Sequence, residues 1–304
     1  MKDITTRQFR LLTDCDMIWQ LMTENYEPLF ANGAPAPFFE YYINNADFKA
    51  AYMSKCRIWL DSGRAVGFVY YEGDVSSIHF ILRRGYDELA PEMVHYADEE
   101  MYGKDKTFTF MDGQTALMKA ASDIGYAKQY TETDNMIDLS RADLDYPLPA
   151  GYRFIKPETV DTLKMTKCLW SGFNNGEIAP DFAPGPETDD DPAVRLYLTV
   201  DGDTLAPPPH STYWHNIIIA DENGDYVCFS GMWWVEKNKL AYMEPLCTVP
   251  AHRRKGLAAA ALSEHCRRMR ALGAEYMTGG GNEFYRSIGY NCEINWQKWK
   301  KCDL

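Results

Sequence analysis

A basic stretch in the second half of the chain has the residue types of an anion-binding site. Between Ala251 and Ala271 the sequence holds six Lys or Arg residues against one acid, Glu264. The stretch follows an apolar segment, LCTV, passes through PAHRRKG, and continues into an alanine-rich segment whose apolar residues fall on one side. A strand, a loop with glycine and a helix start direct several backbone N–H groups to one point, where the helix dipole adds positive charge. This pattern predicts a site for a pyrophosphate.

The same junction resembles the Gln/Arg-x-x-Gly-x-Gly/Ala motif of the GNAT (Gcn5-related N-acetyltransferase) superfamily. The defining positions of that motif are occupied by Arg253, Gly256 and Ala258, and Pro250 stands where the superfamily often has proline. Further along, FYRSIGY (284–290) resembles the second signature, a tyrosine four residues before a Gly-aromatic pair. The strand, the helix and the two motifs together form a specific combination. The order of elements extends the resemblance over residues 151–304.

The resemblance implies that an acyl-CoA, here acetyl-CoA as co-substrate, lies between two splayed central strands. Its pyrophosphate would bind the amides of residues 254–258, and its pantetheine would pair with residues 246–248. A bulge in that strand is also implied, and Pro245 suits a bulge because proline has no N–H for the ladder. Asn282 is closer to the tyrosine than the superfamily's usual asparagine. The predicted acyl-CoA-binding residues are Leu246, Cys247, Thr248, Arg253, Arg254, Lys255, Gly256, Leu257, Ala258 and Asn282.

Two residues are predicted to move protons. Transfer of an acyl group from a thioester to an amine needs one proton acceptor and one proton donor, and no covalent enzyme intermediate. Its position in the second signature makes Tyr285 the implied general acid to the CoA sulfur; the alternative is a packed helix tyrosine. Glu244, just before the implied bulge, is the candidate base, acting through water; the alternative is a solvated or salt-bridged strand carboxylate. The scattered cysteines predict no metal site.

The acceptor side is predicted from acidic and aromatic residues. A loop expected over residues 177–203 holds eight acids and one arginine, so it would attract a cationic amine or be a solvated surface loop. Five aromatic residues are candidates for a pocket or for the core. His265 and Cys266 are adjacent on one helix and do not face each other, which argues against a nucleophilic pair. The glycines at 279–281 predict a turn after a strand. The aromatic residues are Trp170, Phe173, Trp233, Trp234 and Tyr242.

The elements that must position these residues occur twice, in the same order. Each copy ends its last helix with Ile-Gly-Tyr, at 124–126 and 288–290. The fold class predicted is mixed α/β (α+β): two tandem GNAT-like acyl-CoA acyltransferase units, each with a mixed, mostly antiparallel central sheet flanked by helices. The first copy is expected to have strands at 9–13, 57–61, 64–73, 76–83, 106–112 and 135–140, and helices at 89–102 and 115–126. The second is expected to have strands at 152–157, 215–224, 225–236, 239–249, 275–278 and 293–300, and helices at 158–173, 256–273 and 282–289.

The two copies are predicted to differ in function. A segment with two prolines and a glycine, LDYPLPAGYRF, separates a first domain (1–146) from a second (147–304). The first domain has Asp87 and Glu88 where the anion site would be, and Ala121 at the place of Tyr285. We therefore expect a degenerate copy without CoA in the first half and the catalytic domain in the second.

Composition excludes several classes of partner. The 304 residues are 46% apolar and carry a net charge of −13, with −10 in residues 1–150 and −3 in the rest. Nucleic acids and anionic membranes are held mainly by Lys and Arg, so neither is an expected partner. The sequence has no signal-like start and no long apolar window, which predicts a cytoplasmic protein. A monomer or a homodimer is expected.

The sequence thus predicts an N-acetyltransferase that moves the acetyl group of acetyl-CoA directly to a primary amine of a small cationic or peptidyl acceptor. The alternative is a non-catalytic acyl-CoA-binding regulatory or interaction protein.

Overall fold

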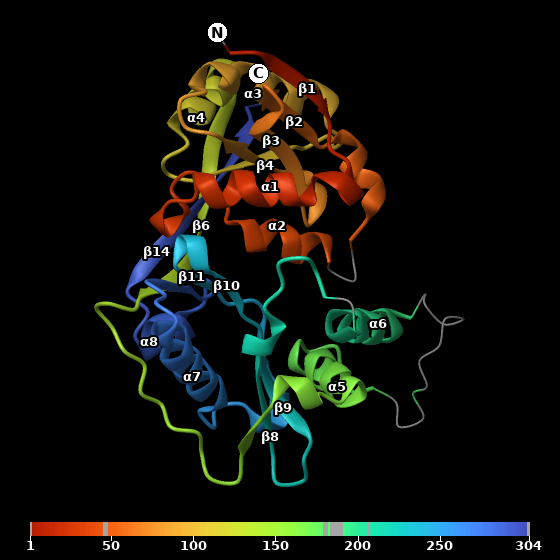
Figure 1. Ribbon diagram of the computed structural model, residues 1–304, viewed down its shortest axis with the longest axis vertical. Coiled ribbons are helices and arrows are strands. Elements are labelled where there is room, and N and C mark those ends of the chain that lie inside the picture. The colour runs from red at the N-terminus through yellow and green to blue at the C-terminus, as the bar shows by residue number, and fades with distance from the viewer. Residues whose placement is uncertain (1, 45–47, 179–181, 183–190, 206, 303–304) are drawn as a thin grey trace. The chain divides into compact units, whose positions relative to one another are not determined.

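The computed structural model describes residues 2–44, 48–178, 182, 191–205 and 207–302 (Figure 1). The chain forms two compact units. Unit 1 comprises residues 1–134 and 293–304, and unit 2 comprises residues 135–292. Both are mixed α/β units with largely antiparallel sheets flanked by helices, as the sequence predicts.

Unit 1 is built on a sheet in the order β1-β2-β3-β4-β5-β14-β6. Neighbouring strands are antiparallel from β1 to β4, whereas β4 and β5 are parallel, with Ile78 opposite Phe108. Strand β3 is buried along nearly its whole length, so both of its faces are covered; α1 with α2 and α3 with α4 form the two helix layers (Figure 1). The strands are β1 (Ile4–Gln8), β2 (Arg57–Asp61), β3 (Arg64–Glu72), β4 (Asp74–Leu82), β5 (Thr107–Phe110), β14 (Cys292–Lys301) and β6 (Tyr126–Asp138); the helices are α1 (Leu11–Asn25), α2 (Ala36–Ile43), α3 (Ala90–Glu100) and α4 (Thr115–Asp123).

Unit 2 contains parts of two sheets, in the orders β6-β13-β11-β10 and β12-β9-β8-β7. Helix α5 packs with α6 on one face of the second sheet, through a core with Met165 and Phe229, and α7 covers the other face through Leu257 and Ala261 (Figure 1). The strands are β7 (Arg153–Ile155), β8 (Ile217–Ala220), β9 (Tyr226–Ser230), β10 (Trp233–Val235), β11 (Leu240–Tyr242), β12 (Leu246–Thr248) and β13 (Tyr276–Thr278); the helices are α5 (Thr162–Gly172), α6 (Pro192–Leu205), α7 (Leu257–Ala271) and α8 (Glu283–Ile288).

The last strand of each half of the sequence pairs differently from what a simple repeat of two units predicts. The strand at the end of the second half, β14, pairs with β5 in unit 1, where Trp299 faces Phe108. The strand that closes the first half, β6, is longer than expected, and its last residues pair with β13, with Ile137 opposite Met277. The units consequently differ from the expected domains, 1–146 and 147–304, in residues 135–146 and 293–304.

Two expected elements were wrong. The strand expected at 9–13 lies earlier, at β1, because Ile4, Thr5 and Thr6 are β-branched and pair with β2, whereas residues 11–13 begin α1. The loop expected at 177–203 contains helix α6, which begins at Pro192 and is capped by the Asp191 carboxylate, 2.8 Å from the N–H of Ala193. The acidic residues at positions 181, 187, 189 and 190 lie outside the described residues. None of the described helices is long and apolar enough to cross a membrane.

Candidate functional site

The central strand pair of unit 2 separates at Met243. Up to that point β11 runs parallel to β13, with Ala241 opposite Met277. The hydroxyl of Thr278, at the end of β13, then accepts a hydrogen bond from the N–H of Met243 at 2.6 Å. Beyond it the chain enters β12, which pairs with β9 in the other sheet. The two strands are therefore splayed, as the sequence resemblance implies.

A β-bulge marks the point of separation. The N–H of Gly231 donates to the carbonyl of Pro245 at 2.8 Å, and the N–H of Glu244 donates to the carbonyl of Gly231 at 3.3 Å. Two residues thus face one across the ladder, which defines a bulge. A Cβ atom at Gly231 would lie 2.2 Å from the Glu244 carbonyl oxygen, so only glycine allows this approach. The implied bulge at Pro245 is present.

Strand β12 offers backbone groups on the side away from β9. The N–H of Gly231 bonds to Pro245, and the N–H of Val249 bonds to the carbonyl of Val227 at 2.9 Å. Because antiparallel strands alternate, Cys247 also faces β9, while the N–H and C=O groups of Leu246 and Thr248 face the opposite way. That side has no neighbouring strand in this sheet among the described residues. The Cys247 side chain is buried against α5, where a Cβ on Gly172 would meet its sulfur.

The loop before α7 has the backbone geometry of an anion-binding junction. Arg254 and Gly256 have left-handed φ angles of 58° and 84°. Helix α7 begins at Leu257, and its first intrahelical bond runs from the N–H of Ala260 to the Gly256 carbonyl. The N–H groups of residues 257–259 precede that bond, and no described side chain caps Gly256. These amides, with the positive end of the helix dipole, suit a phosphate group.

The side chain of Arg253 holds this loop in place. Its guanidinium donates to the carbonyls of Thr248 and Gly172, both at 2.9 Å, and to the side-chain oxygen of Asn174 at 2.8 Å. Three acceptors on two other elements hold the loop against β12 and the end of α5. Arg253, Arg254 and Lys255 are all exposed, and they differ in what their side chains contact. The side chain of Arg253 is therefore engaged with protein carbonyls, and the two following residues present their charges to solvent.

Tyr285 lies in a close-packed pocket of aromatic rings and glycine backbone. It is only 5% exposed, and its ring lies 5.1 Å from that of Tyr290. A Cβ atom at Gly279 would be 2.6 Å from the Tyr285 ring, and one at Gly280 would be 3.0 Å away. The glycines therefore permit the ring to contact the backbone, and they form an irregular segment after β13 in place of the predicted turn. Asn282 caps α8 by accepting from the N–H of Phe284 at 3.1 Å.

The two predicted proton-transfer residues belong to the elements that meet where the strands separate. Glu244 is half-buried at the bulge and follows Met243 directly. Met243 bonds to Thr278, and the hydroxyl of Tyr290 donates to the Thr278 carbonyl at 3.3 Å. Met243, Tyr285 and Tyr290 share one buried cluster. The sequence did not predict the role of Thr278, which bonds to both Met243 and Tyr290. The one feature of the sequence that could have indicated it is a polar residue at the end of a short apolar strand.

Other candidate residues occupy structural positions. The Nε2 atom of His265 is 3.2 Å from the Ser230 carbonyl, and burial lowers the pKa of His265 to about 3. Burial raises the pKa of the Cys266 thiol to about 12, so neither group is prepared for nucleophilic chemistry. Trp233 and Tyr242 are buried opposite each other on β10 and β11, as core residues are. Phe173 is exposed. No group of three or more possible metal ligands occurs among the described residues.

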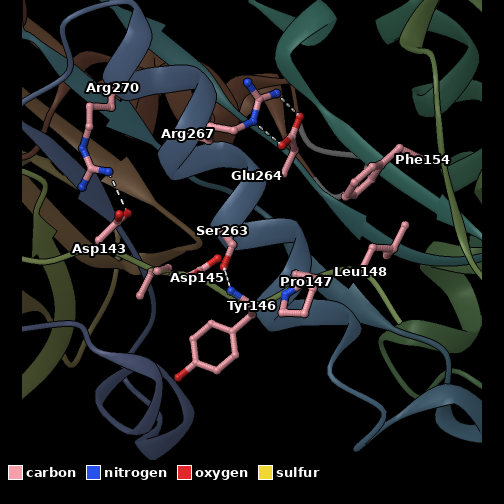
Figure 2. A pocket seen from close by; sticks show the side chains of 12 residues that line it. Asp143, Asp145, Tyr146, Pro147, Leu148, Phe154, Ser263, Glu264, Arg267 and Arg270 are labelled. Atoms are coloured by element: carbon pink, nitrogen blue, oxygen red, sulfur yellow. Dashed lines mark hydrogen bonds and ion pairs between the residues drawn. The ribbon is translucent and has the colours of Figure 1, made fainter. Parts of the chain in front are cut away.

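A groove of about 340 Å³ lies between residues 143–148 and α7 (Figure 2). Its charged side chains largely pair with one another: Arg270 with Asp143 at 2.7 Å, and Arg267 with Glu264 at 2.6 Å. The hydroxyl of Ser263 accepts from the backbone N–H of Tyr146 at 3.0 Å. These bonds fix the segment along the helix.

The splayed parallel strands, the bulge beside the split and the helix start without a side-chain cap are the features that the sequence resemblance implies for an acyl-CoA site. In agreement, residues 177–290 match the model of the Acetyltransferase (GNAT) family. Over this part of its second half the chain is similar in sequence to GNAT acetyltransferases. No curated protein matches the sequence.

Three solved structures share the fold over almost the whole chain. The tandem GNAT protein from the clavulanic acid biosynthesis pathway is 13% identical, with 98% of both chains covered and a TM-score of 0.57. A GNAT family acetyltransferase from Colwellia psychrerythraea is 10% identical, with 99% and 100% covered and a TM-score of 0.59. A GCN5-related N-acetyltransferase from Sphaerobacter thermophilus is 13% identical, with 99% and 98% covered and a TM-score of 0.54. At these identities the likeness concerns the fold alone.

Proposed function

We propose that unit 2 is an acetyl-CoA-dependent N-acetyltransferase that acts on a primary amine of a small cationic or peptidyl acceptor. The observation that carries this proposal is the alignment of three features along one stretch of chain: the bulge at Glu244–Pro245, the open edge of β12, and the start of α7 at Leu257. An acyl-CoA needs the same three things in the same order, namely room for a thioester, backbone partners for pantetheine amides, and an anion site for the pyrophosphate.

Binding of acyl-CoA is assigned mainly to backbone groups. The outward groups of Leu246 and Thr248 would pair with the pantetheine, and the amides of residues 254–258 would hold the pyrophosphate. Lys255 and Arg254 would add charge from solvent. Arg253 holds the loop in place, because its side chain is bonded to Thr248, Gly172 and Asn174. Cys247 and Asn282 contribute by packing and by capping.

In the proposed reaction the acceptor amine attacks the thioester carbonyl carbon. A C–N bond forms, the tetrahedral intermediate collapses, and the C–S bond breaks to give an amide and a thiolate. Glu244, through water, takes the proton that the amine loses, and Tyr285 donates a proton to the leaving sulfur. Both roles are proposals supported by position: Glu244 at the bulge and Tyr285 beside the end of β13.

The acceptor proposal is supported by charge. The chain carries a net charge of −13, which favours cations and disfavours polyanions. A part of the acidic segment lies in helix α6, and the rest lies outside the described residues. A cytoplasmic location, the monomeric or homodimeric state and the absence of nucleic-acid and membrane partners remain predictions from the sequence.

A second candidate is an acyl-CoA-binding protein without turnover. One observation favours it: Tyr285 is only 5% exposed, with its ring packed against Gly279, Gly280 and Tyr290. A general acid must reach the sulfur of the substrate. A tyrosine packed in this way can act as the acid only if its hydroxyl is open to the space between the splayed strands. If the hydroxyl is closed off, the protein would bind acyl-CoA without turnover.

Two measurements separate these functions. In calorimetry with acetyl-CoA, both predict one binding site per chain, and no binding at millimolar ligand would overturn both. A thiol-release assay with a panel of amines, polyamines and peptides then distinguishes them. Release of CoA that depends on an amine supports the enzyme; binding without release from any amine supports the non-catalytic protein.

A further inference from the structure

Asn135 is a buried polar residue that neither sequence motif includes. It is 2% exposed and lies on β6, just before the residues that pair with β13. Its backbone continues that pairing, because its carbonyl accepts from the N–H of Gly279 at 2.8 Å and its N–H donates to the Gly280 carbonyl at 3.2 Å. Two glycines thus face one asparagine, an irregularity that ends the ladder beside the Tyr285 ring.

The side-chain amide of Asn135 joins two elements. Its Nδ2 donates to the Gly280 carbonyl at 2.6 Å, and its Oδ1 accepts from Nε of Arg286 at 3.0 Å. A buried amide is stable only when its polar atoms are bonded, and here both ends are used. The planar amide therefore fixes the separation between the glycine segment and helix α8.

These two elements are the walls around Tyr285. Gly279 and Gly280 touch one side of its ring, as their close approach requires. Helix α8 carries the ring itself, and Arg286 is the next residue in the chain. A change at Asn135 would consequently move the phenol relative to the backbone that surrounds it.

We propose that Asn135 is a positioning residue that sets the location of the Tyr285 hydroxyl by tying Gly280 to Arg286. The inference rests on the proposed role of Tyr285 in acyl transfer. Misplacing a catalytic group by about 1 Å can cost on the order of 100-fold in rate, without any contact between the altered residue and the substrate. Asn135 acts through Tyr285, and so its effect belongs to kcat and not to acyl-CoA binding.

The substitution Asn135→Asp keeps the size and the acceptor for Arg286 but places a carboxylate oxygen against the Gly280 carbonyl. We expect kcat to fall about 10- to 100-fold, while the KM for acetyl-CoA and its calorimetric Kd stay within about twofold. Asn291→Asp is the matched control. Asn291 accepts from the N–H of Asp138 at 3.0 Å, an acceptor role that a carboxylate preserves, so kcat should stay unchanged.

A double-mutant cycle distinguishes positioning from a general loss of structure. In the Tyr285→Phe background, Asn135→Asp should cost no further kcat, because the hydroxyl that it positions is gone. An equal loss of kcat in both backgrounds would refute the proposal. Arg286 provides a second, exposed site for the same test: Arg286→Met should lower kcat, and Arg286→Lys should restore part of it. A kcat for Arg286→Met equal to that of the wild type would also refute it.

A spectroscopic readout does not depend on turnover. With ¹³C-labelled tyrosine rings, the NMR signal that disappears in Tyr285→Phe identifies Tyr285. That signal should shift in Asn135→Asp and stay in place in Asn291→Asp. If the wild type shows no turnover but the signal shifts as expected, the proposed function fails and the positioning geometry holds. If turnover is present and neither the signal nor kcat responds to Asn135→Asp, the positioning proposal alone fails.

Discussion

The two units differ most at the place where a parallel strand pair comes to an end. In unit 1, β4 is one unbroken strand of nine residues, and it pairs in parallel with β5 up to Thr109. In unit 2, the corresponding strand is divided by the bulge into β11 and β12, and only β11 pairs with β13. One unit thus continues a single strand past its partner, and the other turns the strand into a second sheet.

Side-chain amides cover the strand beyond this point in unit 1. The Nε2 of Gln114 donates to the Phe80 carbonyl at 2.7 Å, and its Oε1 accepts from the N–H of Met111 at 2.9 Å. The Nδ2 of Asn25 donates to the Leu82 carbonyl at 3.1 Å. Both amides are nearly fully buried. They occupy backbone carbonyls of β4, whereas in unit 2 the outward backbone groups of Leu246 and Thr248 lie on the open edge of β12, where pantetheine is proposed to bind.

The two units also differ in the charge of the segment that follows this strand. The segment after β4 leads into a short helical turn with Asp87 and Glu88, and Glu88 pairs with Lys2. The segment after β12 carries Arg254 and Lys255 instead. The units therefore differ at the strand edge and at the helix start, the two places where acyl-CoA is proposed to bind in unit 2. This difference supports the prediction that unit 1 binds no CoA.

The largest expected effect is on the general acid. Tyr285→Phe should lower kcat about 1,000-fold, because proton donation to the leaving sulfur is lost, with little change in the Kd for acetyl-CoA. Stopped-flow or steady-state thiol release measures this. The control is Tyr126→Phe in unit 1, whose hydroxyl bonds to Asp98 at 3.0 Å and which should leave kcat unchanged. A kcat for Tyr285→Phe equal to the wild type at every pH would remove the tyrosine from the mechanism.

The next effect is on acyl-CoA binding. Gly256→Glu should raise the Kd for acetyl-CoA at least about 100-fold. The φ of 84° disfavours a side chain at this position, and a carboxylate would repel the pyrophosphate. Gly85→Glu is the control in unit 1: its φ of 80° is equally left-handed, and it also lies between a strand and a helical turn. Weakening by both substitutions alike would contradict the difference between the units.

Removal of the amide that covers β4 tests unit 1 directly. Gln114→Ala leaves the buried Phe80 carbonyl and Met111 N–H without their partner and should lower the free energy of unfolding by about 1–3 kcal/mol. Urea denaturation measures the loss, and the exposed Gln129→Ala should change it by less than about 0.5 kcal/mol. Calorimetry should still find one acetyl-CoA per chain, since Asp87 and Glu88 remain. A second bound acetyl-CoA would show that the amide alone blocks unit 1.

The last prediction concerns the pH dependence of stability. Burial holds the pKa of His79 in unit 1 well below 6.5 and that of His265 in unit 2 at about 3. Each group stays neutral in the folded chain while its unfolded form gains a proton as pH falls below 6.5. The contribution of these two histidines to stability should therefore be constant above that pH and decrease below it, by about 1.4 kcal/mol per pH unit for each histidine.

Two variants test how much each unit contributes to this dependence of the free energy of unfolding on pH. His79→Asn and His265→Asn should each remove about half of the pair's contribution between pH 6.5 and 5, measured by urea denaturation at several pH values. An unchanged slope in either variant would show that the histidine in that unit is not protected from protons.

Most of the local structure was predictable, because it depends on contiguous residues. The strand 57–61 and most helices lie where their periodicity indicates. Strand 9–13 was wrong since three β-branched residues nearer the N-terminus form the edge strand. Period-two alternation shows that a segment is a strand but does not identify its partner, so the pairing of β14 with β5 and of β6 with β13 could not be predicted.

The candidate site also has some features that the sequence predicts and others that only the structure shows. By itself the sequence determined the helix start at Gly256, and through its resemblance to GNAT proteins it implied the bulge at Pro245 and the tyrosine of the second signature; each of these concerns residues close together in the chain. Only the tertiary structure decided that Arg253 faces protein carbonyls, that Gln114 covers the strand in unit 1, and that Asn135 reaches Gly280 and Arg286. These contacts join residues far apart in sequence, where burial forces each polar atom to find whichever partner the folded chain brings within reach.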